Sequence, residues 1–142
     1  MVVDTLKDCV RNQDIGGIKS VFFIILSRRP SPEKINANLN YCFANGIDKN
    51  KLFVAHDGEI FSGNVKDWNI DYYSKQVGKI RNNFSRERMA QVIKMADYLF
   101  AEDNQKRAEA KTNQRAKTDK NDNTIVYIVA GAIAALIAFL FI

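Results

Sequence analysis

Apolar residues recur at helical spacing along most of the first hundred residues of the chain. Positions three and four residues apart lie on one face of an α-helix, so this periodicity predicts a mainly α fold with about five helices. The predicted apolar faces consist of Val2, Val3, Leu6, Cys9 and Val10; Ile18, Val21, Phe22, Ile25 and Leu26; Ile35, Leu39, Cys42 and Phe43; Tyr73, Val77, Ile80 and Phe84; and Met89, Val92, Ile93, Ala96, Leu99 and Phe100.

Capping and terminating residues set the ends of these helices. The Gly16–Gly17 pair is predicted to end the first helix, and Gly46 to end the third. Ser31, which is followed by a proline, is a predicted N-cap with Pro at the first helical position. Ser85 is predicted to cap the last helix in the same way.

Two segments leave alternatives open. The run Val21–Leu26 is expected to form part of a central helix, but Val-Phe-Phe-Ile-Ile is also typical of a buried β-strand. Residues 52–61 are the least helical part of this region. Asp57-Gly58 between short apolar runs indicates a small β-hairpin, with an irregular loop as the alternative.

The pattern changes sharply after residue 103. Residues 104–124 contain no Val, Ile, Leu, Met, Phe, Trp or Tyr, so they have nothing with which to form a core. We expect a basic polar stalk whose first part continues the preceding helix. The predicted organisation is therefore a helical domain over residues 1–103, a stalk over 104–124 and a separate apolar segment over 125–142.

Residues 125–142 carry no charge, and eleven of them are Ile, Leu, Val or Phe. As a helix the segment spans roughly 27 Å, which approaches the ~30 Å hydrocarbon core of a bilayer. A domain of about 100 residues can hardly enclose a helix that is apolar on every face. We therefore expect a single transmembrane helix and a lipid bilayer as the first partner of the chain, rather than a buried core helix.

Charge predicts how this helix is oriented. The whole sequence has a net charge of +5, of which the short stalk supplies six basic and three acidic side chains. Because basic residues flanking a membrane helix stay in the cytoplasm, the N-terminal domain is predicted to be cytoplasmic, as in a tail-anchored, single-pass protein. No signal-peptide pattern opposes this topology. A bacterial inner membrane is favoured over a eukaryotic organelle.

Small residues repeat every fourth position within the apolar segment. Ala130, Ala134 and Ala138 form one row, and Gly131 and Ala135 form a second row beside it. Rows of this kind let two membrane helices approach closely, so they are candidate positions for self-association. Such residues are also common in membrane helices that do not associate.

The sequence offers little catalytic chemistry. His56 is the only histidine, and Cys9 and Cys42 are the only cysteines; both cysteines fall on apolar faces, as expected of reduced core thiols. No zinc-protease, nucleophile-elbow or phosphate-loop spacing is present. The chain is predicted not to be an enzyme and to need no cofactor or metal. A polar turn is the preferred interpretation of His56-Asp57-Gly58-Glu59.

A basic segment between residues 79 and 94 is the remaining candidate site. Its five positive side chains are Lys79, Arg81, Arg86, Arg88 and Lys94. They are interpreted as a solvated helical face or as a contact for a protein partner or anionic lipid. A nucleic-acid interface is the alternative, but residues 1–103 carry fifteen basic and thirteen acidic side chains, too small an excess for a typical binder.

Three functional hypotheses follow. The first is an adaptor whose helical domain binds another protein at the cytoplasmic face of a membrane. The second is a membrane-tethered protein that binds nucleic acid through residues 79–94. The third is a small hydrolase or metal enzyme built around His56.

Overall fold

A computed structural model describes residues 2–112 and 137–141 of the chain. Within these residues the regular elements are helices and no strand occurs, which confirms the mainly α prediction. The elements are α1 Asp4–Arg11, α2 Ile15–Ser27, α3 Pro32–Ala44, α4 Lys49–Leu52, the 3-10 helix η1 Val65–Asp67, α5 Ile70–Lys79 and α6 Arg86–Thr112.

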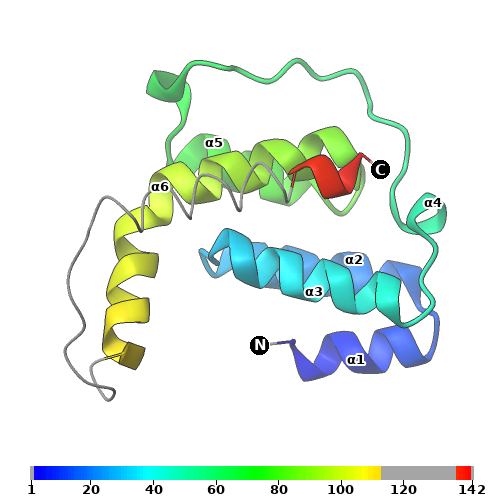
Figure 1. The fold of residues 1–142 in the computed structure, drawn as a ribbon. Coiled ribbons are helices and arrows are strands. Elements are labelled where there is room, and N and C mark those ends of the chain that lie inside the picture. The colour runs from blue at the N-terminus through cyan, green and yellow to red at the C-terminus, as the bar shows by residue number, and fades with distance from the viewer. Residues whose placement is uncertain (1, 113–136, 142) are drawn as a thin grey trace.

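Helix α2 is the centre of the bundle. It packs against α1, α4 and α5, while α3 and α5 both contact α6 (Figure 1). The side chains of Phe22, Ile18 and Leu26 have no exposed surface, as expected for a helix enclosed by its neighbours. The strand alternative for residues 21–26 is therefore wrong. Ile24 is the exception on this helix, because 48% of its surface remains exposed.

The predicted helix caps are largely confirmed. The Ser31 hydroxyl accepts a hydrogen bond from the Lys34 N–H at 3.2 Å, and the Ser85 hydroxyl accepts one from the Arg88 N–H at 3.2 Å. Gly46 follows the C-cap of α3 with φ +95°, a left-handed conformation that a glycine adopts without strain.

The Gly16–Gly17 pair does not end the first helix. Helix α1 ends at Arg11, and the chain reverses through Gln13, whose φ is +54°. Asp14 then caps α2 by accepting a hydrogen bond from the Gly17 N–H at 2.9 Å. The two glycines thus lie in the first turn of α2. Because glycine has no side chain, α1 can pack closely against this turn.

Residues 53–64 form an irregular loop and no hairpin. Asp57-Gly58 does make the predicted turn, because Gly58 has φ +94° and the Asp57 carboxylate accepts the Glu59 N–H at 3.0 Å. The chain then enters η1 without pairing back on itself. The short helices α4 and η1 were not predicted, since three or four residues carry too little periodicity to detect.

Helix α6 continues past the predicted end of the domain to Thr112, so the first part of the stalk does extend the preceding helix (Figure 1). Among residues 2–112 and 137–141, no helix is both long and apolar enough to cross a membrane. Most of the predicted transmembrane segment, 125–136 and 142, lies outside the described residues, as does the rest of the stalk from 113 onward.

Alanine substitutions at the two glycines test how closely α1 packs against the first turn of α2. A methyl group added at Gly17 would lie 2.9 Å from the Cys9 sulfur and 2.8 Å from Cγ of Asp14, so either α1 or the helix cap must move. We expect Gly17→Ala to lower the free energy of unfolding by about 1–3 kcal/mol, measured by chemical denaturation.

Gly16→Ala is the matched control. Its added methyl group would meet only the Asp14 carboxylate, at 3.8 Å, which is an ordinary contact. Alanine in the first turn should therefore leave stability unchanged or raise it by up to about 1 kcal/mol. Equal effects of the two substitutions would contradict the close approach of α1 to Gly17.

Candidate functional site

A fully buried guanidinium lies at the centre of a cluster of polar side chains. Arg88, in the first turn of α6, has 0% exposed surface. Its Nη2 contacts Asp57 Oδ2 at 2.7 Å, and its Nη1 contacts Glu59 Oε1 at 3.2 Å and donates to the Gln76 side-chain oxygen. Its Nε donates to the Asn83 carbonyl oxygen at 3.2 Å. Each nitrogen of the buried cation therefore has an acceptor, as burial of a charge demands.

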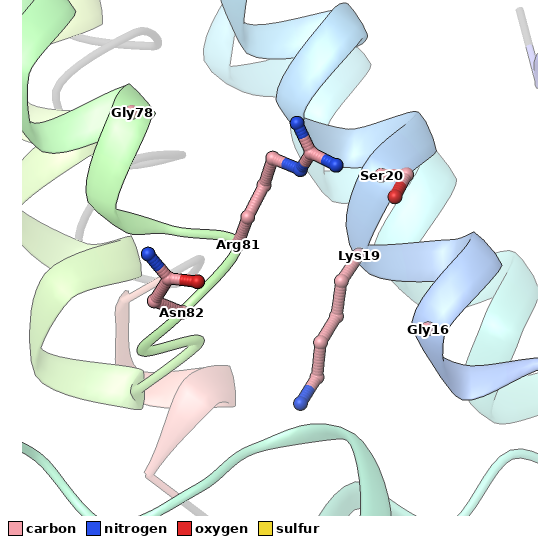
Figure 2. A pocket seen from close by; sticks show the side chains of 6 residues that line it. All are labelled: Gly16, Lys19, Ser20, Gly78, Arg81 and Asn82. Atoms are coloured by element: carbon pink, nitrogen blue, oxygen red, sulfur yellow. The ribbon is translucent and has the colours of Figure 1, made fainter.

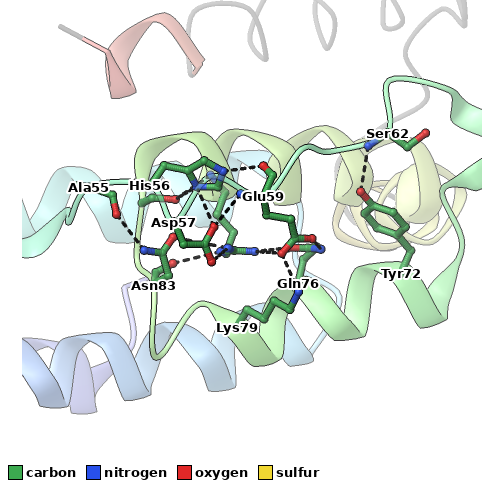
Figure 3. A network of polar contacts seen from close by, with 11 residues as sticks. Ala55, His56, Asp57, Glu59, Ser62, Tyr72, Gln76, Lys79 and Asn83 are labelled. Carbon is green, nitrogen blue, oxygen red and sulfur yellow. Dashed lines mark hydrogen bonds and ion pairs between the residues drawn. The ribbon is translucent and has the colours of Figure 1, made fainter.

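The carboxylate of Glu59 is shared between two helices. Glu59 Oε1 also accepts from Lys79 Nζ at 2.6 Å, and Oε2 accepts from the Gln76 amide at 2.7 Å (Figure 3). The hydrogen bond from Lys79, with further bonds from Gln76 and Arg88, lowers the pKa of Glu59 to about 2 against the opposing effect of burial. The acid thus remains ionised at all physiological pH values.

His56 is held by hydrogen bonds on both ring nitrogens. Nε2 lies 2.7 Å from the Glu59 carbonyl oxygen, which can only accept, so Nε2 carries the proton. Nδ1 lies 2.9 Å from the Ser85 hydroxyl and accepts from it. The resulting Ser–His pair resembles an activated nucleophile, but Ser85 has no exposed surface and its oxygen already caps α6.

The loop from 53 to 64 is attached to the bundle by further hydrogen bonds. The Val54 N–H donates to the Phe84 carbonyl oxygen at 2.9 Å, and the Asn83 amide donates to the Ala55 carbonyl oxygen at 2.9 Å. At its other end, the Ser62 N–H donates to the Tyr72 hydroxyl at 3.0 Å. The whole arrangement explains how an irregular loop keeps one position. It supports the interpretation of residues 56–59 as a polar turn.

The structure separates the five basic residues predicted to form a contact surface. Arg88 is buried, so it cannot belong to a surface, and Lys79 is paired with Glu59. The guanidinium of Arg86 lies 5.0 Å from the Phe53 ring centre and bonds to Asn50. Lys94 is exposed on α6. Sequence periodicity could not reveal the burial of Arg88, because its two acid partners lie about thirty residues earlier in a loop.

Arg81 contributes instead to a cleft that the sequence did not indicate. The cleft has a volume of about 280 Å³ and lies between the first turns of α2 and the turn that joins α5 to α6 (Figure 2). Arg81 reaches across it toward α2, where Lys19 and Ser20 line the opposite wall. The remaining lining residues are Gly16, Gly78 and Asn82.

The chemistry of this cleft suits an anionic group. Lys19 and Arg81 make no ion pair within the described part of the chain, although the Arg81 guanidinium lies 5.4 Å from the Phe23 ring centre. Ser20 adds a hydroxyl and Asn82 an amide to the same lining. In Figure 2 the Arg81 guanidinium points toward Ser20 and the Lys19 ammonium group points away from it, so a carboxylate or phosphate would meet the two positive charges at different ends of the cleft.

The cysteines are both free and occupy different environments. Burial raises the pKa of the Cys42 thiol to about 12, which makes it unreactive at neutral pH. Burial, followed by the nearby Asp14 and Asp8, also raises the pKa of Cys9. Among residues 2–112 and 137–141, no group of three or more His, Cys, Asp or Glu side chains is placed to hold a metal ion.

Comparison with protein-family models, with curated proteins and with solved structures finds no match to this chain. Its own side chains and their contacts are therefore the basis for any functional assignment. Among those groups, the guanidinium of Arg88 is enclosed, whereas the cleft of Lys19 and Arg81 is open to solvent.

The Arg88 cluster predicts a large loss of stability on removal of its cation. Arg88→Met leaves Asp57 and Glu59 without this cation. Because the two carboxylates are 44% and 24% exposed and Glu59 keeps Lys79, we expect the free energy of unfolding to fall by about 1–3 kcal/mol. Denaturation followed by fluorescence of Trp68, whose indole N–H bonds to the Ser62 carbonyl oxygen, measures the loss close to the loop. Lys94→Met, an exposed change on the same helix, should cost less than about 0.5 kcal/mol. Similar costs for the two variants would show that Arg88 does not hold the loop.

The lowered pKa of Glu59 makes the stability of the fold depend on pH. Because folding lowers its pKa from 4.5 to about 2, the ionised group stabilises the fold fully above about pH 4.5, and this stabilisation is lost as the pH falls through 2. The contribution at neutral pH is up to about 3 kcal/mol. The stability advantage of the natural chain over Glu59→Gln should therefore shrink between pH 4.5 and 2. A constant advantage for Glu59 across this range would contradict the assignment.

Proposed function

We propose that the chain is a non-enzymatic adaptor, held at the cytoplasmic face of a membrane by residues 125–142, whose helical domain binds another protein. The observation that carries the proposal is the division of the sequence into a folded helical domain, a polar basic stretch and an uncharged apolar segment. Such a division supports a module that acts at a surface rather than one that processes a substrate. The flanking charge favours a cytoplasmic N-terminal domain, and a bacterial inner membrane is the host membrane in this proposal.

The polar groups of the domain support a binding role over catalysis. His56 forms hydrogen bonds with the Glu59 carbonyl oxygen in the loop and with the Ser85 hydroxyl, and Ser85 also caps α6. Ser85 has no access to solvent. An enzyme built around His56 would need a reacting group within reach of these atoms. The hydrolase hypothesis therefore has weaker support than the adaptor.

The nucleic-acid hypothesis also loses support from the placement of its residues. Of the five bases in residues 79–94, Arg88 is buried and Lys79 is neutralised by Glu59. A phosphate backbone requires several exposed, unpaired cations along one face. The smaller cleft of Lys19 and Arg81 fits a single anionic group better, such as a carboxylate of a protein partner or a lipid headgroup.

Self-association through the small residues of the apolar segment is a separate part of the proposal. Ala130, Gly131, Ala134 and Ala135 lie outside the described residues, while Ala138 is exposed. Two copies brought together by these rows would present two domains to a partner, which raises avidity without any new contact.

Proximity labelling from the full-length protein in its native cell tests the adaptor role. We expect a set of membrane-associated proteins to be labelled, and Lys19→Glu with Arg81→Glu to reduce labelling of the partner several-fold, because repulsion replaces attraction in the cleft. Lys75→Glu with Lys94→Glu, which changes two exposed residues outside the cleft, is the control for the change in net charge. If the full chain labels only what a reporter carrying residues 104–142 labels, the domain recruits nothing and the adaptor function is wrong.

A further inference from the structure

The end of the apolar segment contacts the helical domain. Residues 137–140 form a helical turn, drawn in red in Figure 1. Leu140 is only 1% exposed and belongs to the same apolar core as the bundle helices, and Ile137 packs against that core. A segment more than twenty residues beyond the end of α6 therefore shares the domain's interior.

The surface that receives this turn is aromatic and carries one cation. It consists of Phe43 near the end of α3, Lys49 at the start of α4 and Phe53 just after α4, and is called here the Phe43 patch. The Phe43 ring centre lies 5.9 Å from that of Phe139 and 5.9 Å from that of Phe53. These separations are typical of favourable aromatic pairs.

Lys49 makes the contact specific for the end of a helix. Its Nζ lies 4.1 Å from the Phe139 ring centre and 5.2 Å from that of Phe43, so the ammonium group is held between two aromatic faces. The same Nζ lies 3.4 Å from the Phe139 carbonyl oxygen and donates to it. Carbonyl groups in the last turn of a helix have no partner within the helix, and a lysine is a suitable donor to them.

This contact cannot exist while residues 125–142 span a bilayer. Phe139 lies fourteen residues beyond Ile125, which places it about 21 Å deep along a membrane helix that enters at Ile125. The Phe43 patch belongs to a domain that remains in water. Contact with the patch and insertion into lipid are therefore mutually exclusive positions for the same five residues.

We propose that the Phe43 patch is a receptor for residues 137–141 of the same chain, and that insertion of the apolar segment into a bilayer withdraws these residues and uncovers the patch. This inference rests on the membrane anchorage proposed above. The device has two consequences: the apolar end is covered before it reaches a membrane, and the patch becomes accessible only on a protein that is already anchored.

Site-specific photocrosslinking from position 139 tests the two positions. Benzoylphenylalanine replaces Phe139 in the full chain, which is synthesised in a membrane-free translation mixture and irradiated before and after addition of phosphatidylcholine vesicles. Before addition, we expect an intramolecular crosslink to a peptide within residues 43–53. After vesicle binding, this crosslink should be lost and replaced by lipid adducts. The same probe at Phe141, which is 53% exposed, should crosslink less to the domain.

Lys49→Ala supplies the energetic test. Removing the cation–aromatic contact should reduce the intramolecular crosslink about two- to fivefold and favour vesicle binding correspondingly. Lys51→Ala, an exposed change on the same short helix, should alter neither. Circular dichroism confirms that both variants remain folded. Equal crosslinking by the two variants would overturn the role of Lys49.

The outcomes separate this inference from the anchoring proposal. A chain that forms the crosslink in solution but never binds vesicles contradicts the membrane anchor and leaves the Phe43 patch as a structural contact. A chain that binds vesicles but forms no crosslink in solution, or keeps it unchanged after binding, overturns the two-position device alone. A crosslinked product with twice the mass of the chain also overturns it, because the occupant is then a second copy.

Discussion

The arrangement of this domain depends on the ion pairs that the buried guanidinium of Arg88 forms with two carboxylates of the loop. Residues 53–64 lack regular secondary structure, so they cannot secure their own position by a ladder of backbone hydrogen bonds. Arg88 has no exposed surface, and it draws Asp57 and Glu59 from that loop onto the start of α6. Because a buried cation without acceptors costs several kcal/mol, the loop and the helix can only take up their positions together.

The same cluster links the loop to both α5 and α6. Gln76 and Lys79 bring α5 to Glu59, and Ser85 connects the α6 cap to His56. The side chains of His56 and Ser85 thus hold the loop and the α6 cap in position. The binding roles proposed for the domain depend on two other surfaces, the cleft lined by Lys19 and Arg81 and the Phe43 patch.

The sequence predicted the helices well because their cores obey a simple period. Ile18, Phe22 and Leu26 fall on one face of α2 and are completely buried, and Ser31 and Ser85 cap the helices that they were expected to cap. The Gly16–Gly17 pair was misplaced because glycine both ends helices and permits close packing, and only the approach of α1 distinguishes these roles. The burial of Arg88 and the cleft of Arg81 depend on contacts between distant segments, which local patterns do not encode.

Two apolar environments, a bilayer and the surface of the domain, compete for the apolar segment. Its eleven Ile, Leu, Val and Phe residues favour a bilayer by roughly 3 to 7 kcal/mol, and within the described residues 137–141 the domain contacts Ile137 and Leu140. A bilayer should therefore take the segment whenever one is present. In this account lipid, and not the domain, is the final environment of residues 125–142.

Depth-dependent fluorescence quenching measures that environment most directly. A single tryptophan at position 133, introduced as Ile133→Trp with Trp68→Phe, would lie near the middle of the segment in vesicles that contain brominated lipids. If the segment spans the membrane, we expect the strongest quenching by bromines near the bilayer centre. Quenching that is absent, or strongest at the headgroup level, would contradict a membrane-spanning segment and with it the tethered adaptor.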